Sequence, residues 1–193
     1  MLQLLLAATL TLSTPQPAQT ASHTLVADVA PRSGWSRINI PETKLSLLMP
    51  GKFEDGGKQS IGKEGDGLRD VHPYTYQGNG LVVTIVISHG PKETHIDDSV
   101  LKEASKGLIQ GMQQNADKVE IVDQKKDVLD STPAYRMNVR ASISDQPLMN
   151  HVLLLGDNAT LCVIVVSYFE GDSSSLGAAK DCYASIRYAD VKG

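Results

Sequence analysis

The segment SHGPKETHIDD gathers the side chains with the clearest capacity for metal chemistry in this sequence. His89, His95 and Asp97 lie within it, and Asp98 follows directly. Imidazole and carboxylate groups are ligands for Zn²⁺ and similar metals, so His89, His95 and Asp97 are candidate metal ligands. Their spacing does not fix them around one ion, and Asp97 also suits the N-cap of a following helix. A solvated loop is the competing interpretation.

Two other patterns resemble catalytic motifs without meeting their requirements. The stretch GKQSIGK, residues 57–63, matches a phosphate-binding loop up to the last position, where Glu64 replaces the required Ser or Thr. Glycines at 65 and 67 also prevent a helix from starting there. Ser88 and His89 are sequence neighbours, so on a strand their side chains point to opposite faces. The sequence therefore predicts no enzyme and no cofactor, and a hydrolase with a site assembled from distant residues is the remaining enzymatic alternative.

A third pattern concerns binding rather than catalysis. In the segment AYRMNVRA, apolar residues alternate with Arg136, Asn138 and Arg140, as on a strand with one buried face. Arg136 and Arg140 would then share the outer face, where they are candidate contacts for an acidic partner. Solvated surface charge is the alternative.

Composition excludes several classes of protein. The chain has 193 residues, of which 41% are hydrophobic, enough for one domain with a real core. Lys and Arg total 18 against 22 for Asp and Glu, a net charge of −4, and only 5% of residues are aromatic. A dedicated nucleic-acid binder would normally carry an excess of positive charge and aromatic side chains for stacking. No nucleic-acid partner is therefore predicted.

The first 21 residues have the character of an export signal. The segment from Leu2 to Leu12 is mainly apolar and is followed by a Pro/Gln/Thr stretch. It is about half as long as the roughly 20 residues that span a bilayer, which argues against an integral membrane protein. We expect a signal peptide at residues 1–21 and a linker at 22–34, and the alternative is an uncleaved tail.

Two cysteines, Cys162 and Cys182, are compatible with an oxidising compartment. A disulfide between them would stabilise the fold by roughly 3 kcal/mol in the chain-entropy model. Both also lie at apolar positions, so two free thiols in the core are the alternative.

Hydrophobic periodicity places the elements that would carry these residues. Residues 51–67 form a surface loop rich in glycine, and residues 68–77 an edge strand because Pro73 cannot donate to a central ladder. Helices are expected at 97–113 and 173–185, with Asp97 and Asp172 as N-caps. The expected strands are 35–40, 44–50, 68–77, 81–88, 119–129, 134–141, 147–155 and 160–169.

This order of elements predicts a single α+β domain at residues 35–188, with a tail at 189–193. The strands follow one another through short turns, so the sheet is mainly antiparallel, and the two helices cover it.

The order, with Trp35 followed by I-x-I, an LSLLMPG turn and a closing ASIRY, resembles the PsbP-like superfamily. That group includes a thylakoid-lumen photosystem II subunit and bacterial envelope proteins such as the DcrB-like family. The resemblance implies an α/β/α sandwich, no catalysis and an accessory or binding role. No metal or partner site carries over, because no residue motif here matches one.

These observations favour an exported (periplasmic or secreted), non-enzymatic domain that binds a protein partner in the cell envelope. A small-ligand or metal-binding module, using the loop at 51–67 or the one at 89–98, is the second hypothesis.

Overall fold

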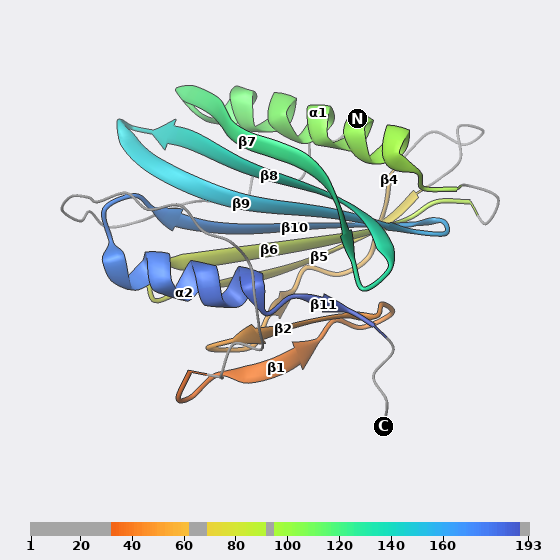
Figure 1. Cartoon of the computed structure of the whole chain (residues 1–193), viewed down its shortest axis with the longest axis horizontal. Helices are drawn as coiled ribbons and strands as arrows, with labels where there is room; N and C mark the ends of the chain where they lie inside the picture. The colour runs from red at the N-terminus through yellow and green to blue at the C-terminus, as the bar shows by residue number, and fades with distance from the viewer. Residues whose placement is uncertain (1–31, 62–68, 92–94, 190–193) are drawn as a thin grey trace.

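The computed structural model of the chain describes residues 32–61, 69–91 and 95–189 (Figure 1). The expected signal peptide, most of the expected linker and residues 190–193 of the expected tail lie outside these ranges. The strands are β1 (Ser36–Asn39), β2 (Leu45–Met49), β3 (Glu54–Asp55), β4 (Gln59–Ile61), β5 (Arg69–Gly78), β6 (Leu81–His89), β7 (Lys118–Leu129), β8 (Thr132–Ile143), β9 (Gln146–Asp157), β10 (Thr160–Phe169) and β11 (Arg187–Tyr188). The helices are α1 (Asp98–Asn115) and α2 (Ser173–Ala184).

The strands form two antiparallel sheets rather than one. The large sheet has the order β3-β5-β6-β10-β9-β8-β7, with β4 also paired to β5, and the small sheet has the order β1-β2-β11. The predicted mainly antiparallel α+β class is confirmed. Strand β6 lies inside the large sheet, between β5 and β10, as its apolar sequence predicts.

The sequence-based element list is wrong at three places. The expected loop at 51–67 contains β3 and β4, and its residues 62–67 lie outside the described part. Both strands pair with β5, so β5 is not the edge strand that Pro73 predicted; Pro73 lies between the segments of β5 that pair with β4 and with β3. Strand β11 follows α2 and pairs with β2. All three strands have only two or three residues, too few for a side-chain period to be visible in the sequence.

Tight turns set the register of the large sheet. The loops between β5 and β6, β7 and β8, and β8 and β9 each have two residues, and both have positive φ: Asn79 and Gly80, Asp130 and Ser131, Ser144 and Asp145. Such turns match the right-handed twist of a hairpin. Only the first contains glycine, so only that one was recognisable as a turn signal.

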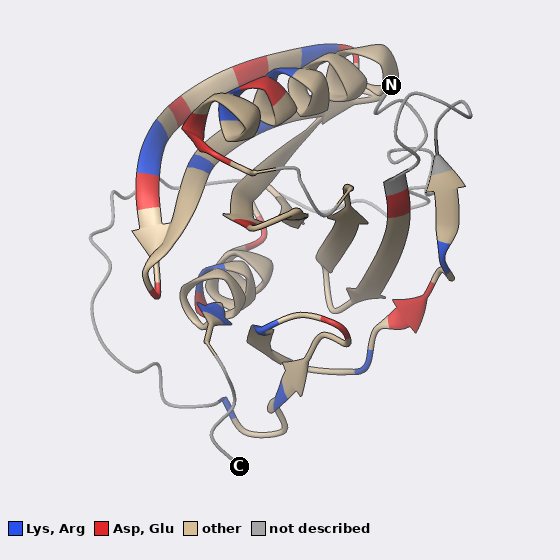
Figure 2. Ribbon diagram, turned by 90° about the vertical axis from the view of Figure 1, so that its right-hand side faces the viewer, with Lys and Arg blue, Asp and Glu red and all other residues tan. Residues whose placement is uncertain are grey.

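Each face of the large sheet has its own apolar core. Helix α1 packs on β7, β8 and β9, whereas α2 packs on β10, β6 and β2 (Figures 1 and 2). Side chains from successive residues of β9 and β10 enter opposite cores, as strand geometry requires. Leu154 and Val163 contact the α1 side, and Leu153 and Ile164 contact the side of α2 and the small sheet.

Capping fixes the starts of both helices. Asp97 accepts hydrogen bonds from the backbone N–H groups of Ser99 and Val100, at 2.9 and 3.0 Å, and Asp172 accepts one from Ser174 N at 3.0 Å. Both predicted N-caps are therefore confirmed. The buried residues of α1 are Leu101, Ser105, Leu108, Gly111 and Met112. No helix in the described ranges is both long and apolar enough to cross a membrane.

Gly156 on β9 provides a test of how the start of α1 packs on the large sheet. A Cβ there would lie 2.8 Å from Ile96 Cβ, and Ile96 is buried with Leu101 in the α1 core. We expect Gly156→Ala to lower the free energy of unfolding by about 1–3 kcal/mol, because Ile96 must move. Gly111→Ala is the matched control, since a Cβ at Gly111 meets nothing within 4 Å. The control should be neutral or stabilising by about 1 kcal/mol in urea unfolding. Equal effects of the two substitutions would contradict this packing.

Candidate functional site

The three predicted metal ligands do not converge in the structure. His89 lies at the end of β6, where its Nδ1 is 3.1 Å from Thr160 Oγ1 and its Nε2 is 3.8 Å from Glu42 Oε2. Asp97 is occupied in capping α1, and the Ser99 hydroxyl, which donates to it, helps to hold the pKa of this carboxyl below its usual range. His95 is exposed. No group of three or more potential ligands that could hold a metal occurs among the described residues; residues 92–94 of this loop lie outside them.

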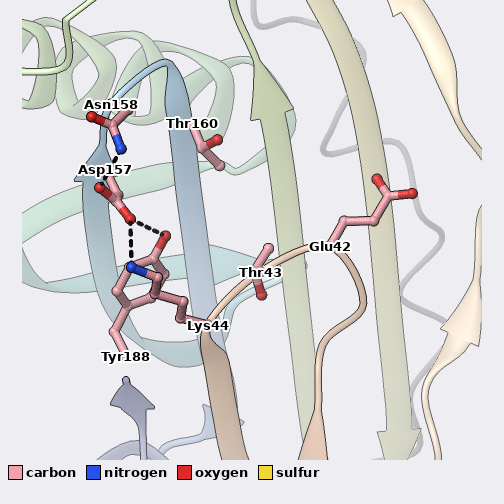
Figure 3. Close-up of a pocket in the computed structure, with 7 residues that line it drawn as sticks. All are labelled: Glu42, Thr43, Lys44, Asp157, Asn158, Thr160 and Tyr188. Carbon is pink, nitrogen blue, oxygen red and sulfur yellow. Dashed lines mark hydrogen bonds and ion pairs between the residues drawn. The ribbon is translucent and has the colours of Figure 1, made fainter. Parts of the chain in front are cut away.

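A polar pocket of about 340 Å³ is lined in part by Thr160 and Glu42, the two residues that His89 contacts (Figure 3). Three segments far apart in sequence form its wall: the turn before β2, the β9–β10 hairpin and β11. Its lining residues are Glu42, Thr43, Lys44, Asp157, Asn158, Thr160 and Tyr188. Because the wall comes from both sheets, no local sequence pattern could have predicted it.

Asp157 is the centre of the interactions in this pocket. Its Oδ2 lies 3.7 Å from Lys44 Nζ and 3.4 Å from the Tyr188 hydroxyl. Burial raises the pKa of Tyr188, so the phenol stays protonated and donates to the carboxylate. Glu42 accepts a hydrogen bond from Lys58 at 2.6 Å, which lowers the pKa of its carboxyl. The charged groups Lys44, Asp157 and Glu42 of the wall are thus paired within the protein.

A chain of three polar residues links β3 and β5 in a catalytic-looking array. Asp55 Oδ1 lies 2.5 Å from His72 Nε2, and His72 Nδ1 lies 3.0 Å from the Tyr74 hydroxyl. Tyr74 is only 4% exposed, and burial raises the pKa of its phenol. A hydroxyl that is buried and harder to ionise is a poor nucleophile. The array therefore links β3 to β5 rather than preparing a nucleophile. Sequence analysis missed the acidic partner of His72 because β3 is too short to be recognised.

The two candidate partner-binding arginines occupy different environments. Arg136 does not lie on an exposed face as predicted: its side chain is 13% exposed, pairs with Asp127, and lies 5.3 Å from the ring centroid of Tyr183 on α2. The prediction was wrong because it treated this face of β8 as solvent-exposed, whereas α2 covers the face where Arg136 lies. Arg140 is 40% exposed and forms a bidentate ion pair with Glu170 at 2.9 Å, with Glu120 at 3.5 Å.

The neighbouring strand β7 is the more unusual surface. It is a 12-residue strand at the end of the large sheet, and no strand pairs with its outer edge in the described part of the chain. The large apolar side chains exposed in this part all lie on β7: Ile121 at 42%, Val122 at 48% and Val128 at 64%. A long edge strand with exposed apolar side chains is a template for pairing with another chain.

His151 is a buried titratable group beneath α2. Its Nδ1 donates to Asn138 Oδ1 at 2.7 Å, and its ring lies 5.3 Å from that of Tyr183. Its Nε2 is buried, with no hydrogen-bond partner among the residues that the structure describes. Burial, with a smaller contribution from Lys180, lowers the pKa of His151 to about 4. The imidazole is therefore neutral in the folded protein at neutral pH.

This buried imidazole should make stability depend on pH. Between pH 6.5 and about 4 the unfolded chain binds a proton at His151 and the folded chain does not, so stability falls as pH falls through this window. The contribution amounts to about 3 kcal/mol. We expect His151→Gln to remove that part of the pH dependence in urea unfolding between pH 7 and 4. An unchanged slope in the variant would show that His151 titrates normally.

The two cysteines are free thiols in the structure, which therefore contains no disulfide between them. Both lie in the core shared by α2 and the small sheet. Cys182 Sγ is 3.5 Å from Met49 Sδ, while Cys162 is beside the Tyr188 hydroxyl. Burial raises the pKa of each thiol to about 12.

Buried thiols of this kind should be unreactive. In the folded protein we expect no reaction of Cys162 or Cys182 with a thiol reagent at pH 8, and two equivalents of reaction in denaturant. The melting temperature should not change when a reductant is added. An intact mass lower by two hydrogens, with a melting temperature that falls on reduction, would establish the bridge instead.

No family model and no curated protein matches this chain. Its structure is similar to the solution structure of cyanobacterial PsbP (CyanoP) from Synechocystis. The two share 10% sequence identity with a TM-score of 0.53, and the match covers 84% of this chain and 97% of that one. The chain has a PsbP-like fold. The predicted resemblance is confirmed at the level of fold.

Two structures from Pseudomonas aeruginosa are also similar, each with a TM-score of 0.40. One is a protein of unknown function, at 9% identity, with the match covering 77% of this chain and 90% of that one. The other is the T6SS immunity protein TplEi in complex with a peptide, at 17% identity, covering 63% of this chain and 48% of that one.

Proposed function

We propose that this chain is an exported, non-enzymatic accessory domain of the cell envelope that binds a protein partner. Residues 1–21 act as its signal peptide, residues 22–34 as a linker, and residues 35–188 form a PsbP-like α/β/α sandwich followed by a short tail. The PsbP-like fold supports the accessory role. The apolar start of the sequence supports export to the periplasm or beyond.

The observation that carries the binding role is the outer edge of β7. An unpaired strand edge offers a row of backbone N–H and C=O groups, to which an extended segment of another protein can add a strand. The exposed side chains of Ile121, Val122 and Val128 would lose their contact with water on pairing. The burial of apolar surface and the new backbone hydrogen bonds would both stabilise the complex.

Arg136 and Arg140, the predicted partner contacts, contribute to binding at the β7 edge mainly by holding acidic residues of β7. Arg136 holds Asp127, and Arg140 contacts Glu120 at 3.5 Å. These pairs position acidic side chains along the edge. Arg140, at 40% exposure, is itself close enough to the surface to contact an acidic partner.

A cross-linked capture experiment tests this role. The tagged full chain is expressed in its host, cross-linked, and purified separately from the envelope and cytosolic fractions. We expect one dominant envelope protein, and capture reduced about tenfold or more by Val128→Lys, because a solvated ammonium opposes strand addition. Asn39→Lys is the matched control: it places the same charge at an exposed position on β1, in the other sheet, and should leave capture unchanged.

Equal capture by the two variants would contradict the β7 edge as the binding surface. Recovery of the chain from the cytosol alone would contradict export. If no protein is captured, the pocket around Asp157 becomes the leading site, and a small polar ligand the leading partner. The 340 Å³ pocket, lined by paired charges from both sheets, favours that second function.

A further inference from the structure

The geometry points to a second copy of this chain as the occupant of the β7 edge, paired antiparallel about a two-fold axis between Val122 and Asp123. This inference rests on the proposed binding role of β7 and specifies the partner at that surface. The axis would join the two large sheets edge to edge. A two-fold interface of this kind uses the same surface of both copies.

A bulge in β7 prepares the strand for this symmetry. The register with β8 shifts between Ile121 and Asp123, leaving Val122 as the extra residue. Before the bulge, Lys118 and Glu120 lie opposite Ser142 and Arg140. After it, Asp123, Lys125 and Asp127 lie opposite Asn138, Arg136 and Ala134. Since these five residues of β8 all lie on one face, so do the five charged residues of β7.

Charges of both signs follow one another along this face in an order that complements itself. From the start of β7 the signs are positive at Lys118, negative at Glu120 and Asp123, positive at Lys125 and negative at Asp127, as the coloured bands along the long curved strand show (Figure 2). Antiparallel pairing about the proposed axis places Lys118 opposite Asp127 of the second copy, and Glu120 opposite its Lys125. Each pair occurs twice, which gives four attractive cross-strand pairs.

Neighbouring registers lose this complementarity. Shifting the pairing by one residue toward the C-terminal end of β7 places Asp123 opposite Asp123 of the second copy. Shifting it one residue the other way places Lys118 opposite Lys126. Either shift also mismatches the faces of the two strands, because one residue reverses the side-chain direction.

The charges on β7 are incompletely paired within one copy. Neither Lys118 nor Lys125 forms an ion pair within 4 Å among the described residues. Lys125 acts on Asp127 only as a more distant charge, and it lies directly opposite Arg136, a like charge. Two of the three acidic residues on this face already pair with β8, Glu120 with Arg140 and Asp127 with Arg136. A second copy would supply a carboxylate to each lysine, Asp127 to Lys118 and Glu120 to Lys125. The ion pairs between β7 and β8 would then extend across the interface. Ile121 and Val122 lie beside the axis, so pairing would also bury them.

Charge reversal on the full chain tests the occupant and the register together. By sedimentation at several concentrations, we expect the unmodified chain to form a dimer. Lys125→Glu and Glu120→Lys should each raise the dissociation constant about tenfold or more, because each turns two attractive pairs into repulsive ones. Mixing these two variants in equal amounts should restore the dimer, since every opposed pair is again of opposite sign.

Both variants should fold normally. Lys125→Glu places a carboxylate opposite Arg136, and Glu120→Lys leaves Arg140 its bidentate pair with Glu170. Unchanged thermal unfolding verifies this. Lys102→Glu on α1 is the control, because it makes the same charge change at an exposed position outside β7 and should leave the dimer intact.

A dimer that survives Lys125→Glu, or a mixture that stays monomeric, would overturn the proposed register. A monomeric chain at all concentrations would overturn the second copy as the occupant. The proposed function fails on a separate result, namely envelope capture that Val128→Lys does not change. A monomer whose capture is lost in Val128→Lys would mean that β7 binds a different protein.

Discussion

The structure depends on a sheet whose central strands are apolar on both faces. Strands β6, β9 and β10 direct buried side chains into two separate cores, represented by Val86 and Ile85 on β6. Such a sheet is stable in water only if each face is covered. Helix α1 covers one face, and α2 with the small sheet covers the other (Figure 1). In the chain, α1 follows β6 and α2 follows β10, and the two helices pack on opposite faces of the sheet.

Covering the faces does not cover the edges. On the β5 side, the short strands β3 and β4 pair with the sheet beyond β5. On the other side β7 ends the sheet, with apolar residues and charges of both signs along its length. Its bulge at Val122 is a device that in many edge strands discourages pairing. Here the bulge brings charges before and after it onto one face, which makes pairing selective for a strand with the complementary order.

Polar groups inside the α2 layer explain why the charge pattern of the sequence was misleading. Arg136 and Asn138 alternate with apolar residues on β8, the pattern of a half-exposed strand, and His151 lies opposite Asn138 on β9. In the structure they lie under α2, where Tyr183 contacts both Arg136 and His151. A face of mixed polarity is compatible with burial only when its polar groups find partners. Asp127 pairs with Arg136, and the Asn138 side chain accepts from His151 Nδ1. Among the side chains of the described residues, only Nε2 of His151 remains buried without a hydrogen-bond partner.

The sequence by itself determined the elements whose signals are local. The caps Asp97 and Asp172 lie next to the helices they start, and Asn79 and Gly80 next to the strands they join. Continuous apolar runs mark the central strands, and apolar alternation marks β8. These features depend on residues a few positions apart, so the order of the main elements and the α+β class could be inferred without coordinates. The candidate site could not. The division into two sheets, the pairing of β11 with β2, the pocket around Asp157, the burial of Arg136 and the unpaired edge of β7 all depend on which distant segments meet. Which segments meet is determined by the packing of the two cores, to which residues throughout the chain contribute. No short stretch of sequence is therefore enough to predict it.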